Sequence, residues 1–168
     1  MPLTARHVFT LHVDLAEPID VGQVPSGHLR IIPITGGTVD GPELSGTILP
    51  GGADWNLSGT DGFGRLWARY DLSTDNGAVV GVINEGAHRI SAASEPAVDS
   101  SNLAIITRPV FEASAGAPSW LNTGSFAGIL RVVGHGRVNI EVSSLVIQPL
   151  PASRRRASGM GPEPACGI

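Results

Sequence analysis

Hydrophobic and polar residues alternate with a period of two along several short segments of this chain. Residues 65–73 show the alternation most clearly. One face carries Leu66, Ala68, Tyr70 and Leu72, and the other carries Arg65, Trp67, Arg69 and Asp71. Because successive side chains of a β-strand point to opposite faces, this pattern predicts a half-buried strand.

Similar patterns predict eight or more strands, separated by turn signals. The predicted strands cover residues 7–15, 28–35, 44–49, 53–57, 65–73, 78–84, 103–112, 126–133 and 137–148. Asp61-Gly62 and Asp75-Asn76-Gly77 are typical of tight hairpin turns. A loop with Pro18 and Pro25 is expected between the first two strands. Pro33 lies inside the second strand, where it predicts an edge position or a bulge.

Residues 32–70 hold nine of the 22 glycines. Gly36-Gly37 and Gly51-Gly52 are not phosphate-binding loops, because neither pair is followed by Lys-Ser or Lys-Thr or by a helix. Glycine inside a strand indicates a bulge, a corner or a close approach of another backbone. We therefore interpret these glycines as corners and bulges of a small closed sheet.

Two segments lack strand periodicity. Residues 85–101 read as a long loop, and loops of this length in compact domains are usually functional or disordered, so this loop is a candidate lid. The end of the chain contains Arg154-Arg155-Arg156 with glycines and prolines, and residues 151–168 are predicted to form a disordered tail. A single domain is expected over residues 1–150.

Many short strands and no convincing amphipathic helix predict an all-β fold, either a barrel or a sandwich. We favour an antiparallel β-barrel of about eight to ten strands, because strand glycines suit its corners. A barrel of about eight strands has a lumen that holds one small ligand.

Composition excludes several classes of protein. The chain has 168 residues, a net charge of −4 and a sequence pI near 5.6. An acidic chain lacks the basic face that a nucleic-acid-binding protein needs. Cys166 is the only cysteine, so no internal disulfide can form. No apolar run is long enough for a membrane span, and no signal pattern begins the chain, so a cytoplasmic location without membrane partners is expected.

Three blocks of sequence carry a resemblance to a known family. They are ITGGTVDGPELSGTILPGGADWNLSGTDG, LWARYDLSTDNGAVVGVINEG and ITRPVFEASAGAPSWLNTGSFAG. In this order they resemble domain of unknown function family 3237 over about residues 9–146. The resemblance implies an antiparallel barrel of the lipocalin-like or allene-oxide-cyclase-like kind, often as a homo-oligomer. It implies no established activity.

Asp54 is the first candidate for catalysis, because it follows Gly-Gly-Ala and precedes Trp55 in an apolar stretch. A carboxyl that faces an apolar lumen has its pKa raised by desolvation, which suits a general acid or base near neutral pH. The alternative is that Asp54 caps a bulged turn by accepting hydrogen bonds from backbone N–H groups.

Arg69, Tyr70 and Arg108 are candidates for stabilising negative charge on a substrate. The planar guanidinium of an interior arginine binds carboxylates and enolates. Alternatively, each arginine forms an ion pair with Asp54, Asp71 or Glu112. Arg69 and Tyr70 are adjacent and must face opposite ways, and their neighbours in the strand favour Tyr70 as the inward residue. A polar lumen with an apolar exterior buried in an oligomer would reverse this assignment.

Five further residues are candidates for substrate binding. Trp55, Trp67 and Trp120 either line an aromatic pocket or belong to the core. Asn84 and Asn122 either donate to a developing oxyanion or satisfy loop backbone groups. His12 and Asp14 have same-face spacing for two metal ligands, but no HxxxH or HExxH motif supports a metal site, so none is predicted.

These features predict a cofactor-independent cyclase, isomerase or lyase that binds a small aromatic or polyketide-like molecule in the lumen. Asp54 would move a proton, while Arg69, Arg108 or Tyr70 would stabilise developing charge. The alternative function is a barrel that binds a small molecule as a carrier or sensor without catalysis. A third possibility is a structural oligomer module whose lumen is filled by side chains.

Overall fold

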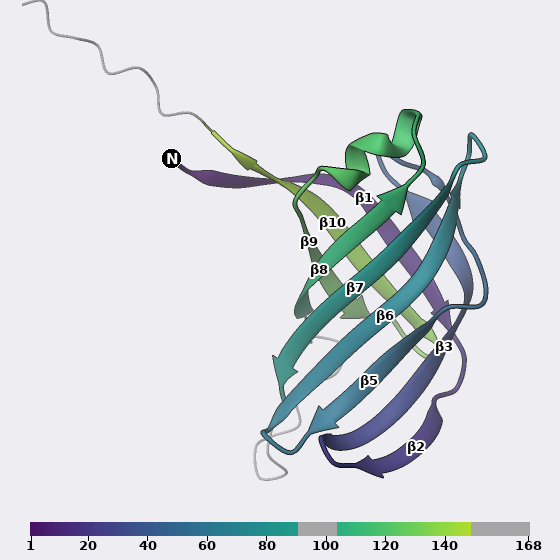
Figure 1. The fold of residues 1–168 in the computed structure, drawn as a ribbon, viewed down its shortest axis with the longest axis vertical. Helices are drawn as coiled ribbons and strands as arrows, with labels where there is room; N and C mark the ends of the chain where they lie inside the picture. The colour runs from purple at the N-terminus through teal and green to yellow at the C-terminus, as the bar shows by residue number, and fades with distance from the viewer. Residues whose placement is uncertain (91–103, 149–168) are drawn as a thin grey trace, which may run out of the picture.

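The computed structural model describes residues 1–90 and 104–148, in which antiparallel strands curve round to form a barrel (Figure 1). The strands are β1 (Leu3–Leu15), β2 (Ile19–Val24), β3 (Gly27–Asp40), β4 (Gly46–Ile48), β5 (Ala53–Gly59), β6 (Phe63–Thr74), β7 (Val79–Arg89), β8 (Ala104–Ala113), β9 (Phe126–Val132) and β10 (Arg137–Ile147). A short 3₁₀ helix, η2 (Ala117–Asn122), precedes β9.

The sheet closes because β1 pairs with β10 on one side and with β3 on the other. From β10 the order continues through β9, β8, β7 and β6. Both β4 and β5 lie between β6 and β3, so they share one of the eight positions round the barrel. The remaining strand, β2, pairs with β3 alone. The predicted all-β antiparallel barrel is therefore confirmed.

Most predicted strands are present, with two corrections. The predicted loop between the first two strands contains β2, whose residues are largely exposed and whose short alternation, Ile19-Asp20-Val21, ends at a register shift before Gly22. The predicted loop at 85–101 was wrong in its first part, because β7 continues to Arg89. Residues 91–103 and 149–168 lie outside the described residues, so the lid and the disordered tail stay predictions.

Pro33 lies between two ladders on the same side of β3. Pairing with β2 extends to Ile31, and pairing with β1 begins at Ile34. Among the described strands, neither β2 nor β1 pairs with Pro33 on that side, so its missing N–H group breaks no hydrogen bond of a ladder. At Gly37, which has φ +138°, the backbone carbonyl of His12 comes so close that an added Cβ would clash with its oxygen. This contact confirms that a paired glycine admits a close backbone approach.

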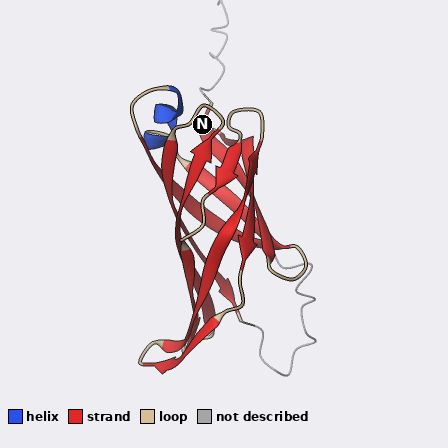
Figure 2. Ribbon diagram, turned by 90° about the vertical axis from the view of Figure 1, so that its right-hand side faces the viewer, coloured by secondary structure: helices blue, strands red, loops and turns tan. Residues whose placement is uncertain are grey.

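The two ends of the lumen differ. The short helix η2 lies at one end of the barrel (Figure 2), and aromatic side chains fill the interior there. The ring of Phe111 lies 5.7 Å from Phe9 and 5.2 Å from Phe126, and Trp120 lies 5.7 Å from Phe126. At the other end, which we call the mouth, β1 ends and β3 and β6 begin.

In residues 1–90 and 104–148, no helix is long and apolar enough to cross a membrane.

Candidate functional site

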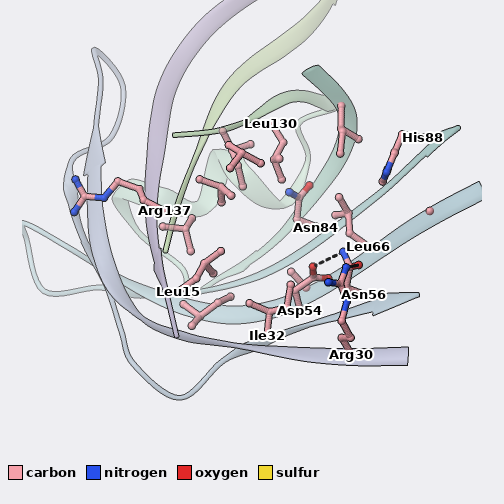
Figure 3. Close-up of a pocket in the computed structure, with 18 of the residues that line it drawn as sticks. Leu15, Arg30, Ile32, Asp54, Asn56, Leu66, Asn84, His88, Leu130 and Arg137 are labelled. Carbon is pink, nitrogen blue, oxygen red and sulfur yellow. Dashed lines mark hydrogen bonds between the residues drawn. The ribbon is translucent and has the colours of Figure 1, made fainter. Parts of the chain in front are cut away.

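A pocket of about 360 Å³ occupies the lumen at the mouth (Figure 3). This volume lies in the lower part of the range of small-molecule sites. Most of its lining is apolar. The polar lining residues are Arg30, Asp54, Asn56, Ser58, Tyr70, Asn84, His88 and Arg137. Asp54 is the only carboxyl group of the described residues that lines this pocket.

Strand register places Asp54 and Asn84 in one row across the wall. Asp54 pairs with Ala68 of β6, and Ala68 pairs with Asn84 of β7. Neighbouring strands are about 4.8 Å apart, so the two backbones are roughly 10 Å apart. The small side chain of Ala68 leaves the space between the carboxyl and the amide open. Asp54, Ala68 and Asn84 all line the pocket.

The Asp54 carboxyl is held at a break in the ladder between β5 and β6. Pairing stops after Asp54 and Ala68 and resumes at Leu57 and Arg65. In this gap the backbone N–H of Trp67 donates to Asp54 Oδ1 at 2.9 Å. Asp54 is thus both a lining residue and an acceptor for a backbone N–H, so the two interpretations of its role are compatible.

A chain of hydrogen bonds joins Asp54 to the mouth. Asn56 Nδ2 donates to Asp54 Oδ2 at 3.3 Å, and Arg30 Nη2 donates to Asn56 Oδ1 at 3.1 Å. The chain fixes the orientation of the Asn56 amide, because its oxygen must face the guanidinium. Its nitrogen then faces the carboxylate.

Burial raises the pKa of the Asp54 carboxyl above its ordinary value of 3.8. The hydrogen bonds from Asn56 and the Trp67 N–H and the positive charge of Arg30 act in the opposite direction and only partly offset it. Desolvation penalises the charged form of a carboxyl group. Asp54 therefore keeps its proton to a higher pH than an exposed aspartate.

Two neutral polar side chains lie buried at the same wall. The hydroxyl of Tyr70 and both amide atoms of Asn84 have no hydrogen-bond partner within the described residues. Burial also raises the pKa of Tyr70, so its phenol stays protonated and can donate. A buried polar group without a partner costs about 1–3 kcal/mol. A ligand that supplies partners would recover part of this free energy.

The structure does not bring Arg69 or Arg108 to the pocket. Strand alternation turns both outward, and Tyr70 is the inward residue, as its neighbours predicted. Arg108 Nη2 lies 2.8 Å from Glu85 Oε2, and Arg69 Nη2 lies 4.0 Å from Glu112 Oε2. The ion-pair interpretation therefore describes these two arginines better than substrate binding.

The three tryptophans also lie outside the pocket. Trp55 and Trp67 face outward from adjacent strands and pack edge to face, with ring centroids 5.4 Å apart. Trp120 belongs to the aromatic cluster under η2. Asn122 bonds the backbone N–H and carbonyl of Ala113 at 2.7 and 2.8 Å. Its amide therefore satisfies the backbone rather than a ligand.

Sequence reasoning missed Arg30, Asn56 and His88. Alternation could have found the first two, because residues 30, 32 and 34 of β3 and 54, 56 and 58 of β5 all line the pocket. His88 lay in the segment that we predicted as a loop. His12 and Asp14 have other partners, Asn139 at 2.9 Å and Arg137 at 2.7 Å. Three or more potential metal ligands do not cluster anywhere in residues 1–90 and 104–148.

The fold and the pocket define this chain as a small closed β-barrel with a pocket at one end of its lumen. The model of a family described as protein of unknown function (DUF3237) matches residues 3–145. The chain belongs to this family. The predicted family resemblance is therefore confirmed.

Relatives of this chain come from several bacteria. It is 36% identical over 133 residues to UPF0311 protein RPA1785 of Rhodopseudomonas palustris. The matched stretch covers 75% of this chain and 86% of that protein. It is 31% identical over 123 residues to UPF0311 protein CA_C3321 of Clostridium acetobutylicum, which covers 69% of this chain and 78% of that protein.

Solved structures share the barrel. A crystal structure of a conserved protein of unknown function from Rhodopseudomonas palustris has a TM-score of 0.76 and 34% identity, covering 87% of this chain and 99% of that chain. A β-barrel-like protein from Acinetobacter baumannii has a TM-score of 0.77 and 33% identity, covering 87% and 98%. An enzyme from Penicillium herquei shares the fold at a TM-score of 0.63 and 21% identity, covering 84% and 96%.

Proposed function

We propose that this protein is a cofactor-independent isomerase, cyclase or lyase that binds a small, mainly apolar molecule in the lumen. Asp54 acts as its general acid and base. One observation carries this proposal: the only carboxyl of the described residues that lines the apolar pocket has its pKa raised by burial. A pKa nearer to neutrality suits proton transfer in both directions.

The hydrogen bonds of Asp54 give its two oxygens different roles. Oδ1 is anchored by the Trp67 N–H, and Oδ2 carries only the longer contact with Asn56. Oδ2 is therefore the oxygen that delivers a proton to one substrate atom and accepts a proton from another. This exchange leaves the composition of the substrate unchanged, as an isomerisation or a cyclisation requires.

Asn84 and Tyr70 supply hydrogen bonds to the reacting group. Asn84 lies across Ala68 from Asp54, and its amide offers one donor group and one acceptor. The Tyr70 phenol donates to an oxygen that becomes negative during the reaction. Such preorganised donors stabilise developing charge without reorganising at the moment of reaction. They take the role that we first considered for Arg69 and Arg108.

The apolar lining supports a second candidate function, which is binding without turnover. A carrier or sensor needs the same enclosed apolar volume but no proton transfer. The two functions differ in the fate of the bound molecule, because a carrier releases it unchanged.

Native mass spectrometry of freshly purified protein tests for a co-purified molecule and also reports the oligomeric state. Incubation of that molecule with the protein, followed by chromatography and mass spectrometry, then detects conversion. We expect D54N to lower turnover by at least about a hundredfold with nearly unchanged melting temperature. D71N, on the outer face of β6, is the matched control and should keep full turnover. A folded D54N protein with normal turnover contradicts the catalytic role, and binding without conversion by the wild type favours the carrier.

A further inference from the structure

The inner face of β7 carries two hydrogen-bonding side chains separated by an apolar interval. Asn84, Gly86 and His88 face the lumen at every second position, and Asn84 and His88 line the pocket. Residues four apart on a strand have Cα atoms about 13 Å apart. The first group lies deep in the lumen, and the second lies towards the mouth (Figure 3).

The interval between them is apolar because Gly86 has no side chain. Leu66 is its cross-strand partner on β6. A Cβ at Gly86 would lie 3.0 Å from the side-chain methyl of Thr107, 3.2 Å from the backbone oxygen of Ile106 and 3.3 Å from a methyl of Ile105. Leu66 and Ile105 both line the pocket. A ligand that runs along β7 therefore meets a polar group, then hydrocarbon, then a second polar group.

The imidazole of His88 lies in space that is free because the neighbouring residue on β6 is a glycine. Gly64 is its cross-strand partner, and a Cβ at Gly64 would lie 2.7 Å from His88 Nε2 and still closer to Cε1. The Cε1–Nε2 side of the imidazole thus occupies the space that a side chain at position 64 would need. Nδ1 of His88 is buried and finds no hydrogen-bond partner among residues 1–90 and 104–148.

We infer that the pocket selects an elongated molecule with a hydrogen-bonding group at each end and an apolar middle. The inner group lies between Asn84 and Asp54, where the proposed proton transfer occurs, and the outer group bonds His88. His88 is a specificity-determining residue for this ligand. The inference rests on the proposed function because both use the same lumen pocket.

The test uses α,ω-diols of butane, hexane, octane and decane, each compared with the 1-alkanol of equal chain length. Isothermal titration calorimetry measures the dissociation constant of each compound with the wild-type protein. The octane diol should bind about three- to tenfold more tightly than 1-octanol, since it makes one further net hydrogen bond. The butane diol is too short to reach both groups and should show no such advantage over 1-butanol.

Two variants locate the outer contact. H88F and H88A should each abolish the advantage of the octane diol, measured as the ratio of its dissociation constant to that of 1-octanol within the same variant. H7F is the matched control, because His7 is exposed and remote from the pocket, and it should keep the advantage.

Equal affinity of diol and alkanol in the wild type would overturn the inference, as would an advantage that survives both His88 variants. Failure of every diol to bind would also overturn it. None of these results bears on Asp54, whose role is tested separately by turnover of the co-purified molecule. A normal turnover in D54N with a preserved diol advantage would instead refute the proposed catalysis and leave the ligand class standing.

Discussion

The closed and open ends of the lumen are built from the same strands but differ in the sizes of their inward side chains. Under η2, Phe9, Phe111 and Phe126 fill the interior. Along β6 the inward residues change from Tyr70 to Ala68, then to Leu66, and end in Gly64 at the mouth. Alternation thus defines the lumen, whereas residue size decides where it is hollow.

The two ends also differ in how their polar groups are satisfied. Asn122, near the closed end, bonds both backbone groups of Ala113. Asn84, in the pocket wall, has neither amide atom bonded within the described residues. Stability and binding should therefore depend on different ends of the same barrel.

The largest effect is expected from emptying the closed end. F111A removes a ring that contacts both Phe9 and Phe126, and should lower the free energy of unfolding by about 3–5 kcal/mol. Affinity for the octane diol should not change while the protein is folded. Urea unfolding and calorimetry measure the two quantities. V110A, on the exposed face of β8, should cost no more than about 0.5 kcal/mol. A loss of diol affinity in folded F111A would show that binding also depends on the closed end.

Filling the open end should affect binding more than stability. A68L places a larger side chain between Asp54 and Asn84, where the lumen is hollow. We expect about a hundredfold weaker binding of the octane diol, with a melting temperature equal to or above that of the wild type. A87L, on the outward face of β7, is the control and should bind normally. Unchanged affinity in A68L would show that the ligand does not lie between these residues.

Replacing the two asparagines by leucine should have opposite effects on stability. N84L removes a buried amide without partners and should raise the free energy of unfolding by about 1–2 kcal/mol while weakening diol binding. N122L leaves two backbone groups of Ala113 unpaired and should lower the free energy of unfolding by a similar amount. Chemical unfolding of both variants checks the signs. Destabilisation by N84L would mean that its amide is satisfied in solution.

The smallest effect concerns the outer face of the open end. A double-mutant cycle on W55A and W67A should give a coupling energy of about 0.5–1.5 kcal/mol in unfolding, because their rings pack edge to face. Diol affinity should stay the same in all three variants, since neither ring lines the pocket. A clear loss of affinity would restore the aromatic-pocket hypothesis.

Strand periodicity predicted the fold because most strands have one buried and one exposed face, as β6 does. It failed at β2, where few side chains are buried, and at residues 85–89, where an inward glycine gives no hydrophobic signal. Asp54 and Tyr70 were predicted at the lumen because their neighbours are apolar. Arg69 and Trp67 were ambiguous, because a residue type does not reveal which face of a closed sheet it occupies.

Arg30, Asn56 and His88 could not be identified from their residue types. Arg30 and Asn56 belong to different strands, β3 and β5, and meet Asp54 only through the register between them. His88 depends on the cross-strand Gly64, which lies 24 positions earlier in the chain. Contacts of this kind follow from strand pairing, which local pattern does not contain.

The raised pKa of Asp54 also has a consequence for stability. A carboxyl whose pKa is higher in the folded state binds more protons when folded, so it lowers stability as pH rises from its unfolded pKa of about 3.8 to its folded pKa. The contribution of this group to the free energy of unfolding is greatest below pH 3.8 and is lost once the pH exceeds the folded pKa of Asp54. D54N should remove this part of the pH dependence, and D71N should retain it.

The most direct test of the proposed proton transfer by Asp54 is an NMR titration of the side-chain carboxyl carbons, with assignments from D54N and D61N. Asp54 should titrate above 3.8, because burial raises its pKa, whereas hydrogen bonds from Arg65 and the Phe63 N–H lower the pKa of Asp61 to about 2. The two aspartates should therefore depart from the ordinary value in opposite directions. If Asp54 titrates at or below 3.8, its carboxyl is not desolvated by the lumen, and the proposed proton transfer is contradicted.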